Sequence, residues 1–202
     1  MPIRGREDGV DSLTLEMSER RRWRRLDLPA LEDFEQDGRT FRGRIQVDEA
    51  APWSVEYRIT FDARWVTSHV EATVRDADGA RHLTLRRDAS GRWMADGREI
   101  EACRGALDVD LGATPSTNTS AIRRLGLAVG TSAELTATWV RFPDLTVLPL
   151  HQRYTRLAKH RYRYESLRDG TVVFQAELEV DENELVERYE RFFERVDAPA
   201  PS

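Results

Sequence analysis

The sequence predicts a mainly β protein, in which a large antiparallel sheet curls on itself and one short internal helix is present. Three observations support this fold class. Many segments alternate apolar and polar residues with a period of two, the pattern of strands that bury one face. Turn pairs such as Asp37-Gly38, Asp78-Gly79 and Asp169-Gly170 separate these segments, as in a meander. A sheet of this size must curl or close to bury its apolar face.

The alternation is clearest in residues 53–61, where bulky apolar residues occupy the odd positions from Trp53 to Phe61. Its phase shifts after Trp65, so we expect a turn or bulge near residues 62–65 and a second strand over 65–75. Shorter strands are expected on either side of this hairpin, near Trp23 and over residues 31–36, 41–47, 83–85, 93–95 and 104–111.

The second half of the chain begins with a long polar turn at residues 112–120. Thr119 or Ser120 is expected to cap a short helix over Ala121–Leu125, which Gly126 ends. Alternation then predicts strands over residues 133–139, 146–157, 161–165 and 172–180. The last segment is expected to form a strand over Leu185–Arg188, followed by a short helical or loose end.

The composition divides the chain into one domain with two loose ends. Residues 1–22 are charged and poor in apolar residues, so we expect a flexible arm there. Residues 23–196 are expected to form a single β-roll domain, and residues 197–202 a frayed tail.

The net charge of -5, without a basic block, argues against nucleic acid as a partner. Lys159 is the only lysine, so nearly every basic residue is arginine. Either codon bias explains this excess of arginine over lysine, or some arginines bind phosphate or sugar hydroxyls.

Cys103 is the only cysteine, and the first residues lack the apolar core of a signal peptide. No apolar run approaches the length of a membrane span. We therefore expect a cytoplasmic protein, while the oligomeric state stays undetermined. No histidine spacing matches a zinc site, and no phosphate or dinucleotide loop is present, so neither a metal nor a cofactor is expected.

Two carboxylates are the strongest candidates for chemistry. Asp108 and Asp110 lie two residues apart, on one face of an extended segment. Such a pair can bind a metal or share a proton. The alternative is that they bond the polar loop or pair with Arg123 and Arg124. Asn118, in the polar turn, can bond sugar hydroxyls, although turn formation alone also explains it.

Several segments resemble the putative glycolipid-binding family of bacterial proteins. They are WRRLDLPALEDF (23–34), YRITFDARWVTSHVEATV (57–74), SGRWMADGRE (90–99), LDVDLGATPSTNTSAIRRLGL (107–127) and WVRFPDLTVLPLHQRYTRL (139–157). The likeness extends from about Trp23 to Tyr189, and Ala30 stands where the family pattern has glycine. The resemblance implies a spiral β-roll or incomplete barrel, similar to lipoprotein carriers that shelter acyl chains in a concave apolar groove. The resemblance assigns a catalytic role to no residue of this chain.

The first hypothesis is therefore a non-enzymatic protein that binds a glycolipid or another amphipathic molecule in a concave apolar groove. An acyl chain would lie against aromatic residues, and polar side chains at one opening of the groove would contact the head group. The candidate residues are Trp53, Tyr57, Asp108, Asp110, Asn118, Arg123, Trp139 and Arg141. The second hypothesis is a structural or interaction domain with a filled core. The third is a sugar or lipid hydrolase that uses Asp108 and Asp110.

Overall fold

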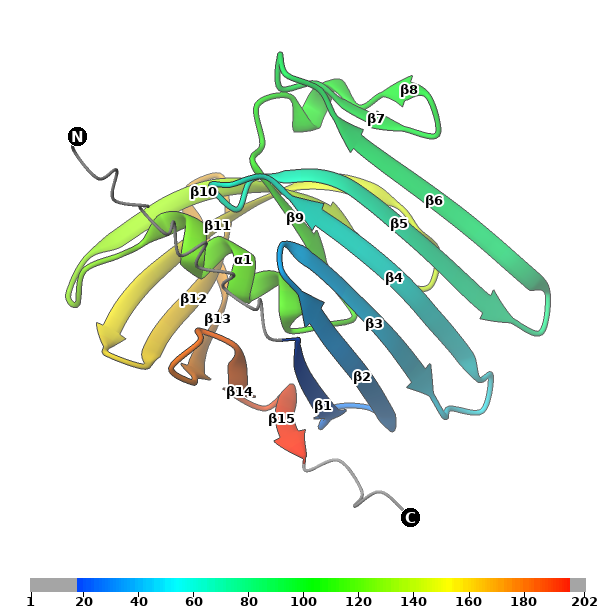
Figure 1. Cartoon of the computed structure of the whole chain (residues 1–202), viewed down its shortest axis with the longest axis horizontal. Helices are drawn as coiled ribbons and strands as arrows, with labels where there is room; N and C mark the ends of the chain where they lie inside the picture. Colours follow the sequence, from blue (N-terminus) through cyan, green and yellow to red (C-terminus); the bar gives the residue numbers. More distant parts are fainter. Residues whose placement is uncertain (1–17, 197–202) are drawn as a thin grey trace, which may run out of the picture.

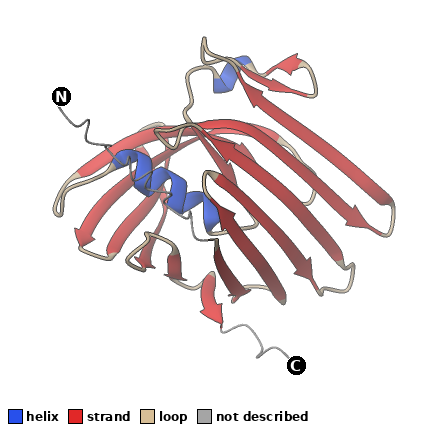
Figure 2. Ribbon diagram, viewed as in Figure 1, coloured by secondary structure: helices blue, strands red, loops and turns tan. Residues whose placement is uncertain are grey.

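The computed structural model describes residues 18–196, which form a 15-stranded sheet curled around the helix α1 (Figures 1 and 2). The strands before the helix are β1 (Glu19–Arg25), β2 (Ala30–Asp37), β3 (Thr40–Val47), β4 (Trp53–Phe61), β5 (Thr67–Asp76), β6 (Gly79–Arg87), β7 (Trp93–Ala95), β8 (Arg98–Glu99) and β9 (Asp108–Leu111). A 3-10 turn, η1 (Glu101–Cys103), precedes β9, and α1 spans Ser116–Leu125. The strands after α1 are β10 (Ser132–Val140), β11 (Val147–Ala158), β12 (Arg161–Arg168), β13 (Thr171–Val180), β14 (Val186–Tyr189) and β15 (Phe193–Val196).

The sheet consists of two meanders that meet at the ends of the described chain. Strands β1–β8 pair in sequence order, as do β10–β15, and β1 joins them by pairing antiparallel with β15. The predicted antiparallel sheet is confirmed except at one edge, where β9 runs parallel to β10. Helix α1 lies between these two strands in the sequence and provides the crossover that parallel neighbours need.

The sheet curls without closing. Its edge strand β9 reaches the start of β5, because the Thr67 amide donates to the Leu107 carbonyl at 2.9 Å. The Val109 amide in turn donates to Thr67 Oγ1 at 3.2 Å. Strands β6–β8 continue past this contact, which gives the spiral outline seen in Figure 1. The predicted curled roll is therefore confirmed.

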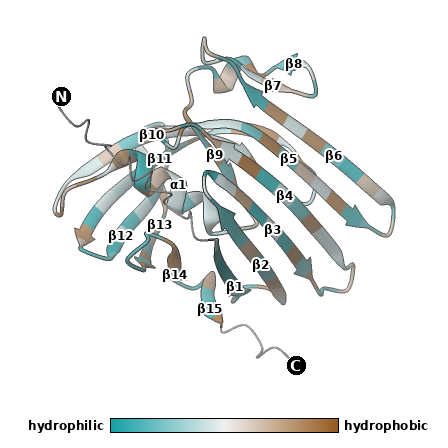
Figure 3. Cartoon of the chain, in the orientation of Figure 1, coloured by the Kyte–Doolittle hydropathy of each residue, from teal (hydrophilic) through white to brown (hydrophobic). Residues whose placement is uncertain are grey.

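Hydrophobic and hydrophilic residues alternate along the strands (Figure 3), and this period-two pattern separates an inner from an outer face. In β4, Val55, Tyr57, Ile59 and Phe61 are buried, whereas the residues between them are half-buried or exposed. Aromatic rings fill the core of the N-terminal meander; they belong to Trp23, Phe34, Phe41, Phe61 and Trp65, with successive centroids 4.8–5.5 Å apart. This part of the roll is thus packed with its own side chains.

The N-terminal boundary of the sheet differs from the prediction. Residues 1–17 of the expected arm and residues 197–202 of the expected tail lie outside the described residues. Residues 19–22 belong to β1, and Glu19 pairs with Gln36 of β2. The charged sequence concealed this strand because its inward side chain, Arg21, is held by ion pairs rather than by apolar packing.

The helix is longer than predicted. It begins at Ser116 instead of Ala121, and neither Thr119 nor Ser120 is its cap, since Pro115 occupies the N-cap position. Gly126 ends the helix as predicted, in the left-handed conformation with φ 53°. Five small polar residues therefore lie in the helix despite their low helix propensity, and three of them, Ser116, Thr117 and Asn118, hydrogen-bond to the surrounding sheet.

Two further segments also differ. The strand expected over residues 104–111 is shortened to Asp108–Leu111, since η1 and a left-handed Gly105 occupy the residues before it. The helical or loose end expected after Arg188 is wrong: the strand β15 follows there. The helical spacing of Leu185, Tyr189, Phe192 and Phe193 arises instead from two short strands around a turn at Arg191, where φ is 65°.

Candidate ligand-binding site

Helix α1 is buried although its first half is polar. Ser116, Thr117, Asn118, Thr119 and Ser120 are all at least nine-tenths buried. The predicted site residue Asn118 accepts a hydrogen bond from the Tyr154 hydroxyl at 2.8 Å and donates to the Pro115 carbonyl at 3.2 Å. The inner face around α1 is therefore a hydrogen-bonding surface, in addition to an apolar one.

Tyr57, another predicted site residue, belongs to a buried cluster at the start of α1. Its hydroxyl donates to Glu32 Oε1 at 2.5 Å and lies 2.9 Å from the Ser116 hydroxyl. Thr114 Oγ1 also donates to Glu32 Oε1, at 2.8 Å. Burial raises the pKa of Glu32 to about 8, and its Oε2 has no hydrogen-bond partner among the described residues. Tyr57 thus ties the sheet to the helix.

The two predicted carboxylates have different partners. Arg124 donates to both oxygens of Asp108, at 2.8 and 2.6 Å, and the Asp108 side chain is only 2% exposed. The alternative predicted for this residue, pairing with Arg124, is thus confirmed. Asp110 instead accepts one hydrogen bond, from Gln152 Nε2 at 2.5 Å. Burial raises the pKa of Asp110 to about 6, and no cationic side chain among residues 18–196 pairs with it.

Asp110 lies within an aromatic cluster of the C-terminal meander. The Asp110 carboxylate raises the pKa of Tyr164 and of Tyr189, after the larger effect of burial. Four rings pack in a closed circuit with centroids 5.4–6.1 Å apart, those of Tyr164, Phe174, Phe192 and Tyr189. Trp139 is the register partner of Asp110 on β10. We call these residues and Gln152 the Asp110 cluster.

Most members of the Asp110 cluster keep part of their surface exposed. Asp110, Trp139, Phe174, Tyr189 and Phe192 are all half-buried, in contrast to four buried rings of the N-terminal meander, those of Trp23, Phe34, Phe41 and Phe61. Because the members come from β9–β14 and the turn after β14, the curl of the sheet brings them together. The partly exposed members offer a carboxylate, the phenol of Tyr189 and aromatic surface to a ligand, whereas Gln152 and Tyr164 are buried.

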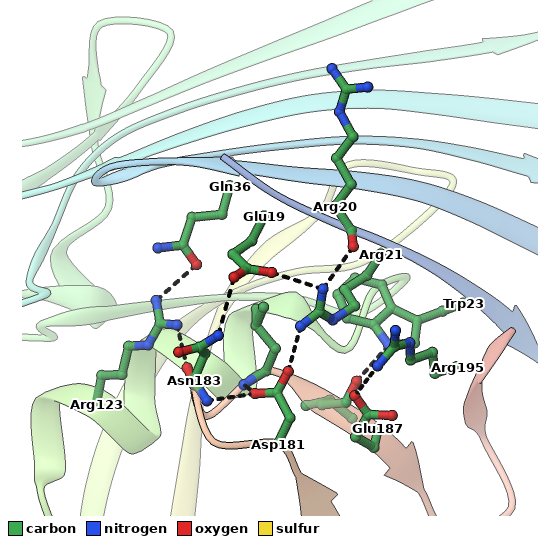
Figure 4. A network of polar contacts seen from close by, with 12 residues as sticks. Glu19, Arg20, Arg21, Trp23, Gln36, Arg123, Asp181, Asn183, Glu187 and Arg195 are labelled. Carbon is green, nitrogen blue, oxygen red and sulfur yellow. Dashed lines mark hydrogen bonds and ion pairs between the residues drawn. The ribbon is translucent and has the colours of Figure 1, made fainter. Parts of the chain in front are cut away.

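Arg123 lies in a separate polar network, between α1, the start of β1, the end of β2 and the turn before β14 (Figure 4). It donates to Gln36 Oε1 at 3.0 Å and to the Asn183 carbonyl, and its guanidinium carbon is 4.4 Å from the Trp65 ring centroid. Burial lowers the pKa of Arg123 to about 10. A pocket of about 580 Å³ adjoins it. Most polar groups of this network bond to one another, although Arg21 Nε has no hydrogen-bond partner among the described residues.

The remaining predicted residues lie elsewhere. Trp53 lines a pocket of about 890 Å³ with Pro29, Leu31 and Pro52, near the turns after β1 and β3. Arg141 is half-exposed and lies 3.8 Å from Asp144, with its guanidinium 5.9 Å from the Trp139 ring centroid. The predicted residues therefore do not form one site. Only Asp110 and Trp139 meet in the Asp110 cluster.

Sequence reasoning missed several members of these clusters. Gln152 and Glu32 are polar residues at inward positions of alternating strands, a signal that the sequence does contain. Tyr189 and Phe192 were assigned to a different local structure. Among the described residues, no three or more histidine, cysteine, aspartate or glutamate side chains gather in a way that could hold a metal ion. Nor does any described helix have the length and apolar character needed to span a membrane.

Comparison with known proteins identifies the family. The family model described as "Putative glycolipid-binding" matches residues 8–195. The chain belongs to this family. The match extends beyond the Trp23–Tyr189 range expected from the sequence segments, at both ends.

A solved structure supports the same assignment. The fold is similar to the crystal structure of a DUF1089 family protein from Pseudomonas aeruginosa, with a TM-score of 0.77 and 34% sequence identity. The alignment covers 83% of this chain and 92% of that one. A search of curated proteins finds no significant match. The relatives therefore support the family and the fold, and the ligand has to be inferred from the site.

Proposed function

We propose that this protein binds a glycolipid or a similar amphipathic molecule without catalysing a reaction, and that the head group contacts the Asp110 cluster. The observation that carries the proposal is the half-buried carboxylate of Asp110, whose register partner on β10 is the half-buried Trp139. Family membership supports a ligand of this class.

The chemistry of the Asp110 cluster fits a polyhydroxylated head group. Asp110 accepts hydrogen bonds, and the hydroxyl of the half-buried Tyr189 both donates and accepts. Ring faces supply apolar contact area for the carbon side of a sugar. Such a mixture, largely apolar with a few convergent polar groups, is typical of small-molecule sites.

The neighbouring apolar side chains fit an acyl chain. Phe174 and Phe192 are half-buried at a centroid distance of 5.4 Å, and Leu148, the register partner of Trp139, is 41% exposed. Covering these side chains with a hydrocarbon chain stabilises a complex by about 25 cal/mol per Å² of apolar area removed from water.

The hydrolase hypothesis is disfavoured by the partners of Asp108. A general acid or base must be able to exchange a proton with the substrate. Both oxygens of Asp108 are occupied by Arg124, so only Asp110 retains a free acceptor. An Asp108→Asn variant that loses a hydrolytic activity of the wild type would support the hydrolase instead.

The proposal can be tested with two tryptophan variants. Trp139 and Trp53 are both half-buried, but only Trp139 adjoins Asp110. We expect Trp139→Ala to weaken the binding of octyl β-glucoside by about 10-fold, as for loss of an aromatic anchor, and Trp53→Ala to leave it almost unchanged. Isothermal titration calorimetry below the critical micelle concentration measures both.

Other results would place the ligand at a different site or argue against a ligand. Loss of binding only in Trp53→Ala would place the ligand in the pocket of about 890 Å³. Absence of binding in the wild type, together with a mass free of co-purified lipid in native mass spectrometry, would favour the filled-core structural domain. The cytoplasmic location and the absence of nucleic-acid binding remain predictions; cell fractionation and a DNA-binding assay check them.

A further inference from the structure

Asp108 and Asp110 are chemically identical neighbours on β9, and only one of them has a positively charged partner. Arg124 holds Asp108 through two hydrogen bonds, whereas Asp110 has only the neutral amide of Gln152. A half-buried carboxylate without a cation carries a cost, because it loses part of its hydration without a compensating charge. The site therefore lacks one positive charge.

We propose that the head group bound at the Asp110 cluster carries a protonated amine or a quaternary ammonium, which pairs with Asp110. This inference rests on the proposed function and specifies its ligand. An amino sugar, an amine-bearing lipid head group and a free alkylamine share this chemistry.

The aromatic rings around Asp110 favour the same charge. A cation near a ring face is attracted by the ring quadrupole, by about 0.5–2 kcal/mol depending on how far it is desolvated. Trp139 is the register partner of Asp110, so one such ring lies on the neighbouring strand beside the carboxylate. Rings with a nearby anion are a common arrangement for binding ammonium groups.

The cationic side chains of α1 and β11 are already engaged. Arg124 is bound to Asp108, and Arg123 to Gln36 and the Asn183 carbonyl. Arg156 of β11 donates to the carbonyls of Leu127 and Lys159. Arg153 of β11 pairs with Glu134 and Glu165. Neither element supplies a positive charge to Asp110, and we assign that charge to the ligand.

A matched pair of ligands tests this inference. Octyl β-glucoside and octyl β-glucosaminide differ in one amino group, which is largely protonated near pH 7. We expect the glucosaminide to bind at least 10-fold more tightly, as for a charge-assisted hydrogen bond. Asp110→Asn should abolish this preference and retain binding of the glucoside. The Asp33 side chain is 63% exposed on the outer face, so Asp33→Asn serves as the control. This variant should retain the preference for the glucosaminide.

The outcomes separate this inference from the proposed function. Equal affinity for the two octyl glycosides would overturn the inference and leave the proposed function standing. Binding of neither would overturn both. Octylammonium that binds as tightly as the glucosaminide, again through Asp110, would support the inference and identify a simple amine as the source of the charge. A preference that survives Asp110→Asn would contradict it.

Discussion

Glu32 illustrates how a single residue couples the sheet to the helix. It is 2% exposed, and its Oε1 accepts hydrogen bonds from the hydroxyls of Tyr57 and Thr114. Its pKa of about 8, against an ordinary 4.5, means that the neutral acid is the form that the fold favours at neutral pH. Ionisation would place an unpaired charge in the interior, where no described cation pairs with it.

The raised pKa predicts a stability that falls as the pH rises. Because the folded pKa exceeds the unfolded one, the stabilisation is fully present below pH 4.5 and is lost as the pH rises through 8. Between pH 6.5 and 8, above the pKa of Asp110, we expect the free energy of unfolding to fall by on the order of 1 kcal/mol per pH unit. Urea denaturation at several pH values measures this slope.

Two variants assign that slope to Glu32. Glu32→Gln keeps the shape of the side chain and cannot ionise, so its unfolding free energy should be flat over the same range. Glu56→Gln, on the exposed face of β4, should retain the wild-type slope. A wild-type protein whose stability does not change over this range would show that the Glu32 pKa is close to its ordinary value.

At the scale of elements, the pairing of β3 with β4 depends on a residue without a side chain. Gly43 is the register partner of Tyr57, and the Tyr57 ring lies across it toward Glu32. A Cβ at position 43 would lie 2.2 Å from Tyr57 Cε1. The glycine therefore gives the ring the room that it needs to reach the helix.

Gly43→Ala is expected to destabilise the protein by about 3 kcal/mol. The overlap forces the Tyr57 ring to move, which disrupts its hydrogen bonds and adds overpacking strain. Gly97→Ala is the matched control: its Cβ meets no atom within 4 Å, and only its φ of 85° adds a penalty, of about 1 kcal/mol. Equal losses for the two variants in denaturant unfolding would contradict the proposed role of Gly43.

For the whole molecule, the junction between β1 and β15 decides whether the two meanders unfold together. Trp23 lies at this junction and is completely buried. Its ring packs on Phe34 at 4.9 Å, and its Nε1 donates to the Val186 carbonyl at 2.7 Å. One side chain thus contacts both halves of the sheet.

We expect Trp23→Ala to cost about 3–5 kcal/mol, as for other large core truncations. Because the junction is shared, the loss should lower hydrogen-exchange protection both in β5 and in β12. Trp53→Ala, at a half-buried position, should cost less and leave β12 unchanged. Loss of protection confined to β1–β5 in Trp23→Ala would show that the two meanders unfold independently.

Strand positions could be predicted because they depend on local chemistry. The alternation from Trp53 to Phe61 reproduces the bounds of β4, and Gly126 ends α1 where expected. The residues of the candidate site were harder to predict from the sequence. Asp108 and Asp110 are equivalent in a local pattern, and only the fold gives one of them Arg124 and the other Gln152.

The sequence alone determined a β-rich chain, its main turns and the face that each strand buries, because periodicity and turn preferences act over a few residues. The tertiary structure decided which strands meet, how far α1 extends, and which buried polar groups find partners. Those outcomes depend on contacts between distant segments, such as Trp23 with Val186 and Tyr154 with Asn118. A period-two pattern specifies a face but cannot specify the residue that lies opposite it.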